Sequence, residues 1–289
     1  MKLAIGTAQF GLDYGIANRQ GQIAPAEALA IIEYASRQGI DMLDTAVAYG
    51  DSEQRLGEVG VGDWQVVSKL PSLPEDCDDI THWVRLQVEG SKLRLKIEGL
   101  YGLLLHRPAE LLESRGAELY LALQQVKRDG LVQKIGISIY DPSELDALID
   151  RYAPDLVQAP LNVFDRRIQS SGWMSRLHGR GIEIHTRSVF LQGLLLVKSH
   201  QRPRQFAPWA NMWTRFDDWL KLHGVTPLQA CLGFPMSLRE VSKVIVGVDS
   251  LAQLQQIVTA AGASVPPLTG SLASEDLDLI NPSRWNALT

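Results

Sequence analysis

The chain has 289 residues, of which 45% are hydrophobic, so it can bury a large core. Its formal net charge of −5 gives no sign of a nucleic-acid or anionic-membrane surface. Cys77 and Cys231 are the only cysteines, so no disulfide framework is implied and a cytoplasmic location is expected. The apolar runs are too short for a signal-peptide core or a membrane span. We therefore expect no membrane and no nucleic-acid partner.

Short apolar runs recur along the chain, and each is followed by a turn and a helical stretch. Continuous apolar runs of this length suit strands that are buried on both faces, as in a parallel sheet. In chain order the expected strands are residues 3–6, 41–43, 65–68, 101–105, 134–138, 155–159, 182–186 and 243–247.

The helical stretches between these runs carry start and stop signals. The first begins at Pro25, spaces Leu29, Ile32 and Ala35 along one face, and stops at Gly39.

Two later stretches carry a capping-box pattern at their start. "DPSELDALIDRY" opens with Asp141 three residues before Glu144, and "SLAQLQQIVTAAG" opens with Ser250 three residues before Gln253.

Strands that alternate with helices over about 250 residues match a (β/α)8 barrel. An open doubly wound sheet is disfavoured because "GTAQFG" is not a G-x-G-x-x-G fingerprint. We predict a single α/β domain over residues 1–289, a (β/α)8 TIM barrel. Substrate loops and a tail of about residues 263–289 should lie near the barrel mouth.

Four polar side chains follow strands two, three and four of this barrel. Asp44 comes directly after strand two, Tyr49 lies in the loop beyond it, Lys69 ends strand three and His106 ends strand four. Each alone has a structural explanation, such as turn capping, loop packing, snorkelling or a backbone hydrogen bond. The C-terminal ends of barrel strands share one mouth, however, and there the four converge.

Their chemistry suits the reduction of a carbonyl group. A tyrosine donates its proton poorly unless a nearby cation favours its ionisation, and Lys69 can supply that charge. Asp44 can hold the ammonium in place, and His106 can orient the carbonyl oxygen. The hydride would come from a cofactor.

The segments "GTAQFG", "DTAVAYGDSE", "SKL", "LLLHRP", "KIGIS", "LVQAPLN" and "VIVGVDS" resemble the aldo-keto reductase family. The resemblance runs in order from residue 4 to about residue 260. It implies NAD(P)H-dependent reduction of a small-molecule aldehyde or ketone to an alcohol. Asp44, Tyr49, Lys69 and His106 match the catalytic tetrad of the family.

The resemblance also implies where the cofactor is held. Ser138, Gln158 and Asn162 match residues that bind the nicotinamide carboxamide, and Gln192 and Gly193 match a loop over the pyrophosphate.

Two positions near this site depart from the family pattern. Ile139 replaces the usual asparagine after Ser138, and Arg187 stands where an aromatic side chain often stacks on the nicotinamide. A guanidinium can stack or pair with phosphate. Arg187 could also be an ion-paired residue at the end of its strand.

The turn and helix start that follow the last strand, from Gly247 through Ser250 to Gln253, suit an anion. Family members that prefer NADPH place a basic residue where this chain has Asp249, and Ile257 replaces a frequent asparagine. A carboxylate would repel a 2′-phosphate and accept hydrogen bonds from ribose hydroxyls, or it could simply cap the helix. The choice between NADH and NADPH stays open, with a lean to NADH.

Aromatic and basic residues around the mouth are candidates for substrate contacts, and we expect only one or two of the aromatics to line the site. Arg107 and Arg187 could recognise an anionic or polyhydroxylated substrate. The aromatic candidates are Phe10, Tyr14, Phe206, Trp209, Trp213, Phe216 and Trp285.

Two other functions fit parts of the pattern. Lys69 could form a Schiff base in a barrel lyase, or the chain could be a non-catalytic NAD(P)-binding regulator. No bound metal is expected, because His106 and His185 are the only histidines at strand ends and no H-x-H spacing occurs. The oligomeric state and the physiological substrate are left open.

Overall fold

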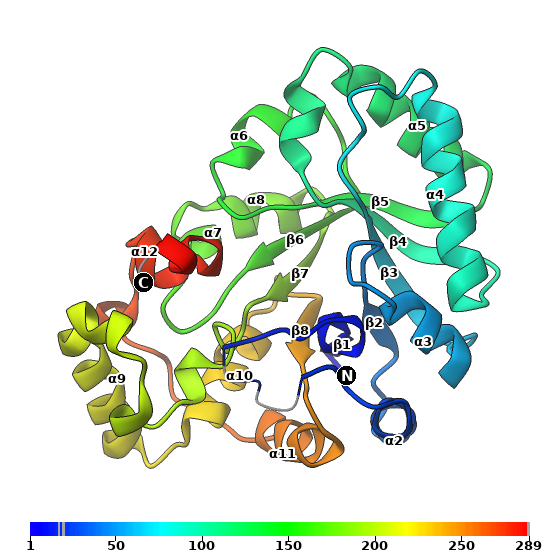
Figure 1. Cartoon of the computed structure of the whole chain (residues 1–289). Coiled ribbons are helices and arrows are strands. Elements are labelled where there is room, and N and C mark those ends of the chain that lie inside the picture. Colours follow the sequence, from blue (N-terminus) through cyan, green and yellow to red (C-terminus); the bar gives the residue numbers. More distant parts are fainter. Residues whose placement is uncertain (17, 19–20, 288–289) are drawn as a thin grey trace.

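The computed structural model describes residues 1–16, 18 and 21–287. Its strands form a closed parallel barrel in the order β1 to β8, with helices around it (Figure 1). This confirms the predicted (β/α)8 fold. The strands are β1 (Leu3–Gly6), β2 (Met42–Asp44), β3 (Gln65–Leu70), β4 (Leu100–Leu105), β5 (Val132–Ser138), β6 (Leu156–Pro160), β7 (Glu183–Arg187) and β8 (Lys243–Gly247).

One or more helices follow each strand and return the chain to the start of the next. The helices are α1 (Ala8–Gly11), α2 (Pro25–Arg37), α3 (Ser52–Val59), α4 (Ile80–Leu95), α5 (Gly116–Arg128), α6 (Glu144–Leu148), α7 (Arg167–Ser170), α8 (Trp173–Gly179), α9 (Ala210–His223), α10 (Pro227–Ser237), α11 (Leu251–Ala261) and α12 (Leu277–Ile280).

Helix α2 begins at Pro25 as expected, but its buried face is rotated from the predicted one. Leu29 is 42% exposed, whereas Ala28 and Ile31 are buried together with Ile32 and Ala35. The prediction was therefore wrong for Leu29. The buried face of the helix instead includes its neighbour Ala28 and, one turn on, Ile31 and Ile32.

Each of the two expected capping boxes forms only one of its two reciprocal bonds. Ser250 caps α11 by accepting a hydrogen bond from the Gln253 N–H at 3.3 Å. The Asp141 carboxylate instead accepts from the Ser143 N–H at 2.9 Å, and Glu144 accepts from the Asp141 N–H at 2.7 Å. Because these bonds hold residues 141–143 in a turn, α6 begins later than expected, at Glu144.

Apolar side chains from alternate strand positions fill the barrel beneath its mouth. Ala4, Met42, Val67, Leu104 and Leu156 are all buried there, together with Ile245. The barrel is thus a packed core rather than a pore, and polar chemistry is confined to its ends.

The C-terminal tail packs on the long segment between β7 and α9. The Trp285 ring lies 4.8 Å from the Phe206 ring, and the Trp209 indole N–H donates to Asp276 at 2.8 Å. Residues 288–289 of the expected tail lie outside the described part of the chain. Within the described part, no helix combines the length and apolar character that crossing a membrane requires.

Candidate active site

Buried hydroxyl groups join the loop after β1 to the loop after β2. The Thr7 hydroxyl donates to the Asp44 carbonyl at 3.0 Å, and the Ser52 hydroxyl donates to the Thr7 carbonyl at 2.9 Å. Thr45 and Ser52 also share a hydrogen bond of 3.2 Å. Because Thr7, Thr45 and Ser52 are fully buried, this network fixes the segment that carries Tyr49.

Two glycines let the backbones of these loops approach closely. A Cβ atom at Gly11 would lie 1.8 Å from the Tyr49 carbonyl oxygen, and one at Gly50 would lie 2.4 Å from the Gly11 carbonyl oxygen. Gly50 also has a φ of 57°, in the left-handed region that favours glycine. The position of Tyr49 therefore depends on the absence of side chains at both glycines.

Asp44 and Lys69 form a buried ion pair at the mouth of the barrel. The Lys69 ammonium donates to an Asp44 carboxylate oxygen at 2.7 Å and to the Thr45 carbonyl at 2.9 Å. The Lys69 side chain is 1% exposed and that of Asp44 is 7% exposed. Burial acts to lower the pKa of Lys69, but Asp44 and Tyr49 outweigh it, so the pKa lies above its ordinary value. Lys69 is therefore held as a cation.

Tyr49 lies between this cation and His106. The Lys69 Nζ atom is 5.1 Å from the centre of the Tyr49 ring, and the Tyr49 and His106 rings meet edge to face at 6.0 Å. The structure thus brings the four predicted catalytic residues together. Tyr49 and His106 are only partly buried, so both can meet a ligand.

The imidazole of His106 is expected to be neutral at physiological pH. Burial and the charges of Lys69 and Arg187 lower its pKa to about 4. A neutral imidazole can both donate and accept a hydrogen bond, which suits the orientation of a carbonyl oxygen.

This pKa gives a direct prediction. In a pH titration followed by NMR, His106 stays neutral from pH 8 down to about pH 5 and takes up a proton only near pH 4, because its cationic form is disfavoured in the site. A His106→Gln variant assigns the resonance. A midpoint near the unperturbed value of about 6.5 would contradict the described environment.

Gln158 links the ion pair to the end of β5. Its amide N–H donates to the second Asp44 oxygen at 2.7 Å, and its oxygen accepts from the Ser138 hydroxyl at 3.4 Å. Gln158 and Ser138 are both buried and lie in register on β6 and β5. They orient Asp44, which in turn holds Lys69.

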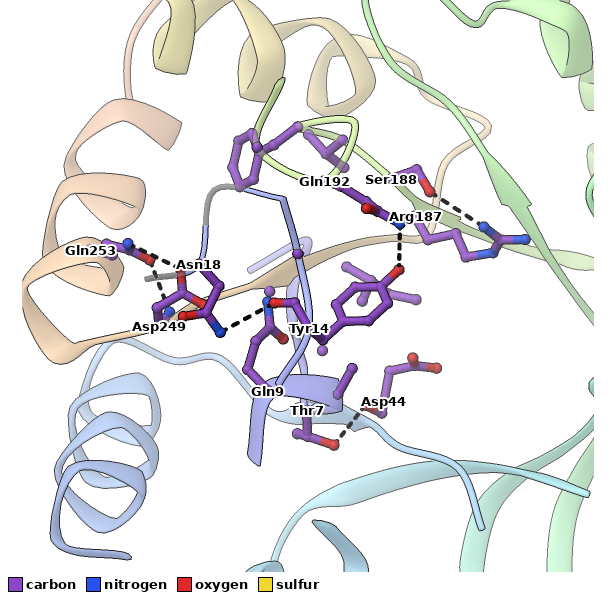
Figure 2. Close-up of a pocket in the computed structure, with 18 of the residues that line it drawn as sticks. Thr7, Gln9, Tyr14, Asn18, Asp44, Arg187, Ser188, Gln192, Asp249 and Gln253 are labelled. Atoms are coloured by element: carbon purple, nitrogen blue, oxygen red, sulfur yellow. Dashed lines mark hydrogen bonds between the residues drawn. The ribbon is translucent and has the colours of Figure 1, made fainter. Parts of the chain in front are cut away.

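A cavity of about 390 Å³ runs from these residues to the turn after β8. Figure 2 shows Asp44 and Arg187 toward one end of it and Asp249 and Gln253 at the other. Tyr14 lies between them, and its hydroxyl accepts a hydrogen bond from the Gln192 amide at 3.4 Å (Figure 2).

Arg187 is not the ion-paired residue that was one reading of the sequence. Among the described residues its guanidinium forms no ion pair, and it donates to the Ile139 carbonyl at 2.9 Å and to the Ser188 hydroxyl at 3.3 Å. Its carbon Cζ stands 4.4 Å from the centre of the Tyr140 ring. Arg187 therefore lines the cavity with an uncompensated positive charge.

The opposite end of the cavity carries a negative charge. Asp249 holds Gln253 through a side-chain bond of 3.3 Å, and its backbone N–H donates to the Gln253 amide oxygen at 2.9 Å. The other carboxylate oxygen of Asp249 is buried and has no hydrogen-bond partner in the described residues. Burial raises the pKa of Asp249. Such an oxygen is suited to accept a hydroxyl donor from a ligand.

The cavity includes some of the expected cofactor residues and leaves others outside. Gln158, Arg187, Gln192, Gly193, Gly247, Asp249 and Gln253 line it, whereas among the described residues Ser138, Asn162 and Ser250 do not. The Asn162 amide instead closes the turn after β6, where it accepts from the Phe164 and Asp165 N–H groups and donates to the Ser188 carbonyl.

Most of the aromatic candidates lie in the core rather than in the cavity. Phe10, Phe206, Trp213, Phe216 and Trp285 are buried, and of the aromatic candidates only Tyr14 is among the described residues that line the cavity. Gln9, Asn18, Tyr140, Phe190 and Leu228 line it without having been expected. "GTAQFG" and "SVFLQG", which flank two strand ends, were the available signals for Gln9 and Phe190.

His185 lies inside the barrel, two residues before the end of β7, with its Nε2 atom 3.5 Å from Glu183. In the described part of the chain no group of three or more His, Cys, Asp or Glu side chains could hold a metal ion.

The closed (β/α)8 barrel, with a buried lysine–aspartate pair beneath a tyrosine at its mouth, has the architecture of a (β/α)8-barrel enzyme. The model of the aldo/keto reductase family matches residues 2–268, so this chain belongs to the aldo-keto reductases. It is accordingly an NAD(P)H-dependent oxidoreductase that acts on carbonyl groups.

Two curated proteins are similar over most of their length. L-galactose dehydrogenase of Arabidopsis thaliana is 26% identical over 258 residues, which cover 83% of this chain and 79% of that protein. The uncharacterized oxidoreductase YqkF of Bacillus subtilis is 23% identical and is covered to 83%, with 82% of this chain aligned.

Solved structures share the fold. An aldo-keto reductase of Bacillus halodurans, in its holo form, superposes with a TM-score of 0.75 at 20% identity, covering 94% of this chain and 89% of that one. The glycerol dehydrogenase of Gluconobacter oxydans gives 0.70 at 20% identity, with coverages of 92% and 88%.

Proposed function

We propose that Tyr49 is the proton donor in the reduction of an aldehyde or ketone, assisted by Lys69, Asp44 and His106. The observation that carries the proposal is the buried Asp44–Lys69 pair beneath the Tyr49 ring, with His106 against its edge. A fixed cation at this distance stabilises the phenolate that remains after proton donation.

The nicotinamide cofactor, when bound, supplies the hydride that adds to the carbonyl carbon. Tyr49 delivers a proton from its hydroxyl to the carbonyl oxygen, which becomes the alcohol, and the phenolate regains a proton from solvent. Neutral His106 orients the carbonyl oxygen by a hydrogen bond. Lys69 stays charged throughout, because Asp44 and the Thr45 carbonyl hold it.

The same geometry disfavours a Schiff-base lyase. A lysine must lose its proton to attack a carbonyl carbon, whereas Asp44 and Tyr49 raise the pKa of buried Lys69. The non-catalytic alternative is disfavoured by the assembled reactive groups.

We further infer that the cofactor is NADH rather than NADPH, and that its adenosine ribose lies against Asp249. The buried Asp249 oxygen without a partner fits a ribose hydroxyl donor and would repel a 2′-phosphate. The absence of a side chain at Gly247 makes room for the Gln9 amide in this turn, because a Cβ atom there would lie 2.5 Å from it. The name of the Arabidopsis relative supports aldoses as the first substrate class to test. A cytoplasmic location remains part of the proposal.

The cofactor preference can be tested by titrating wild type and Asp249→Arg with NADH and NADPH, following tryptophan fluorescence. Wild type is expected to bind NADH more tightly. The arginine should shift the ratio of the two dissociation constants toward NADPH by about tenfold or more, because a repulsive charge becomes an attractive one. Asp249→Asn serves as the control without a new cation. Tighter NADPH binding by wild type would place the phosphate against another residue.

A further inference from the structure

We propose that the natural substrate carries an anionic group, a carboxylate or a phosphate, and that Arg187 binds this group. The inference rests on the proposed carbonyl reduction and specifies its substrate. It follows from the distribution of charge in the cavity and from the position of Arg187 beside the reacting groups.

Arg187 is the only lysine or arginine among the described residues that line the cavity. The other positive charge close to Tyr49 is Lys69, and Asp44 neutralises it at 2.7 Å. His106 is neutral, since burial and the neighbouring cations lower its pKa to about 4. The reaction end of the cavity therefore has a net positive charge that comes from Arg187.

The guanidinium of Arg187 is held in a fixed orientation and keeps N–H donors that can bind a ligand. Bonds to the Ile139 carbonyl and the Ser188 hydroxyl occupy part of it, and the Tyr140 ring lies against its face. Arginine presents its N–H donors in a planar fork that matches carboxylate and phosphate oxygens. A guanidinium that is fixed in this way favours the binding of an anionic ligand over that of a neutral one.

The location of the charge points to the substrate rather than to the nucleotide. Arg187 lines the same cavity as Tyr49 and His106, and Figure 2 shows it toward the end that holds Asp44. The other end carries Asp249, a negative charge. The Tyr14 hydroxyl accepts a hydrogen bond from Gln192, which leaves its proton to donate to the same ligand.

Matched substrate pairs test this assignment. We expect wild type to prefer glyceraldehyde 3-phosphate to glyceraldehyde, or succinate semialdehyde to butanal, in kcat/KM with NADH; the two pairs distinguish a phosphate from a carboxylate. For the preferred pair, Arg187→Gln should lower the ratio of kcat/KM for the anionic substrate to kcat/KM for the neutral one by about tenfold or more, because a charge-assisted hydrogen bond is lost. Arg187→Lys should retain part of the ratio.

Arg107→Gln is the matched control. Arg107 is exposed and close to His106 in the chain, with its guanidinium 3.4 Å from the Ser72 hydroxyl, but it is not among the described residues that line the cavity. Removing its charge should leave the ratio unchanged. An equal fall in both arginine variants would indicate general attraction rather than a site and would overturn the assignment.

A second measurement requires no turnover. In thermal melting of the NADH-loaded chain, glycerol 3-phosphate or 4-hydroxybutyrate should raise the Tm of wild type but not of Arg187→Gln, while glycerol should leave both unchanged. An equal rise in Tm with the anionic alcohols in Arg187→Gln would overturn the inference. So would weaker NADH binding in Arg187→Gln with an unchanged substrate ratio, since Arg187 would then serve the cofactor. If wild type binds NADH and these anions but reduces no carbonyl, the proposed function fails and the anion site stands.

Discussion

Tyr49→Phe is expected to lower kcat for carbonyl reduction by about 10²- to 10⁴-fold, the usual effect of removing a general acid. The substitution removes the donor hydroxyl and keeps the ring that packs against Lys69 and His106. The dissociation constant of NADH should stay within about twofold of the wild-type value, because the loss falls on the transition state. Steady-state kinetics and fluorescence titration measure the two quantities.

The matched control is Tyr34→Phe, which removes a phenolic hydroxyl from the outer helix α2. Its kcat should equal that of wild type. If Tyr49→Phe keeps more than about a tenth of the wild-type kcat, another group supplies the proton and the role given to Tyr49 is wrong.

Lys69→Met is expected to abolish activity and also to lower the free energy of unfolding by about 3–5 kcal/mol, because it leaves the Asp44 charge buried without its partner. The Asp44 side chain is 7% exposed, so solvent cannot compensate the charge. Urea denaturation measures the loss.

The double variant Asp44→Asn with Lys69→Met separates pairing from packing. It should be more stable than the sum of the two single losses predicts, since neither charge then stays buried alone. The amide at position 44 can still bond to Gln158. Simple additivity of the two losses would show that the pair is not coupled. Neither single nor double variant should recover carbonyl reduction.

The barrel was predictable because its strands are buried on both faces. Runs such as "KIGIS" and "KVIVG" have to be continuous and apolar when helices cover one side and the barrel interior the other. Strand ends then share a mouth, so Asp44, Lys69 and His106 could be placed together from their positions in the chain alone.

Side-chain partners were less predictable, because they depend on contacts between distant segments. Trp285 and Phe206 were both candidates for the pocket, although only one or two aromatics were expected to line it, and they pack on one another across 79 positions of sequence. Arg187 was compatible with an ion pair until its neighbours proved to be a carbonyl, a hydroxyl and an aromatic ring. The buried oxygen of Asp249 likewise follows from the fold, not from its place after β8.

The most direct measurement is a single-turnover experiment in which the NADH-loaded chain is mixed with an excess of glyceraldehyde. Carbonyl reduction by Tyr49 predicts that wild type oxidises one NADH per site and forms one glycerol, whereas Tyr49→Phe binds NADH equally well and oxidises it at least about 10²-fold more slowly. Oxidation at the same rate in both proteins would contradict the central role of Tyr49. Failure of wild type to bind either nicotinamide nucleotide, with borohydride trapping glyceraldehyde on Lys69, would replace the reductase assignment by Schiff-base chemistry.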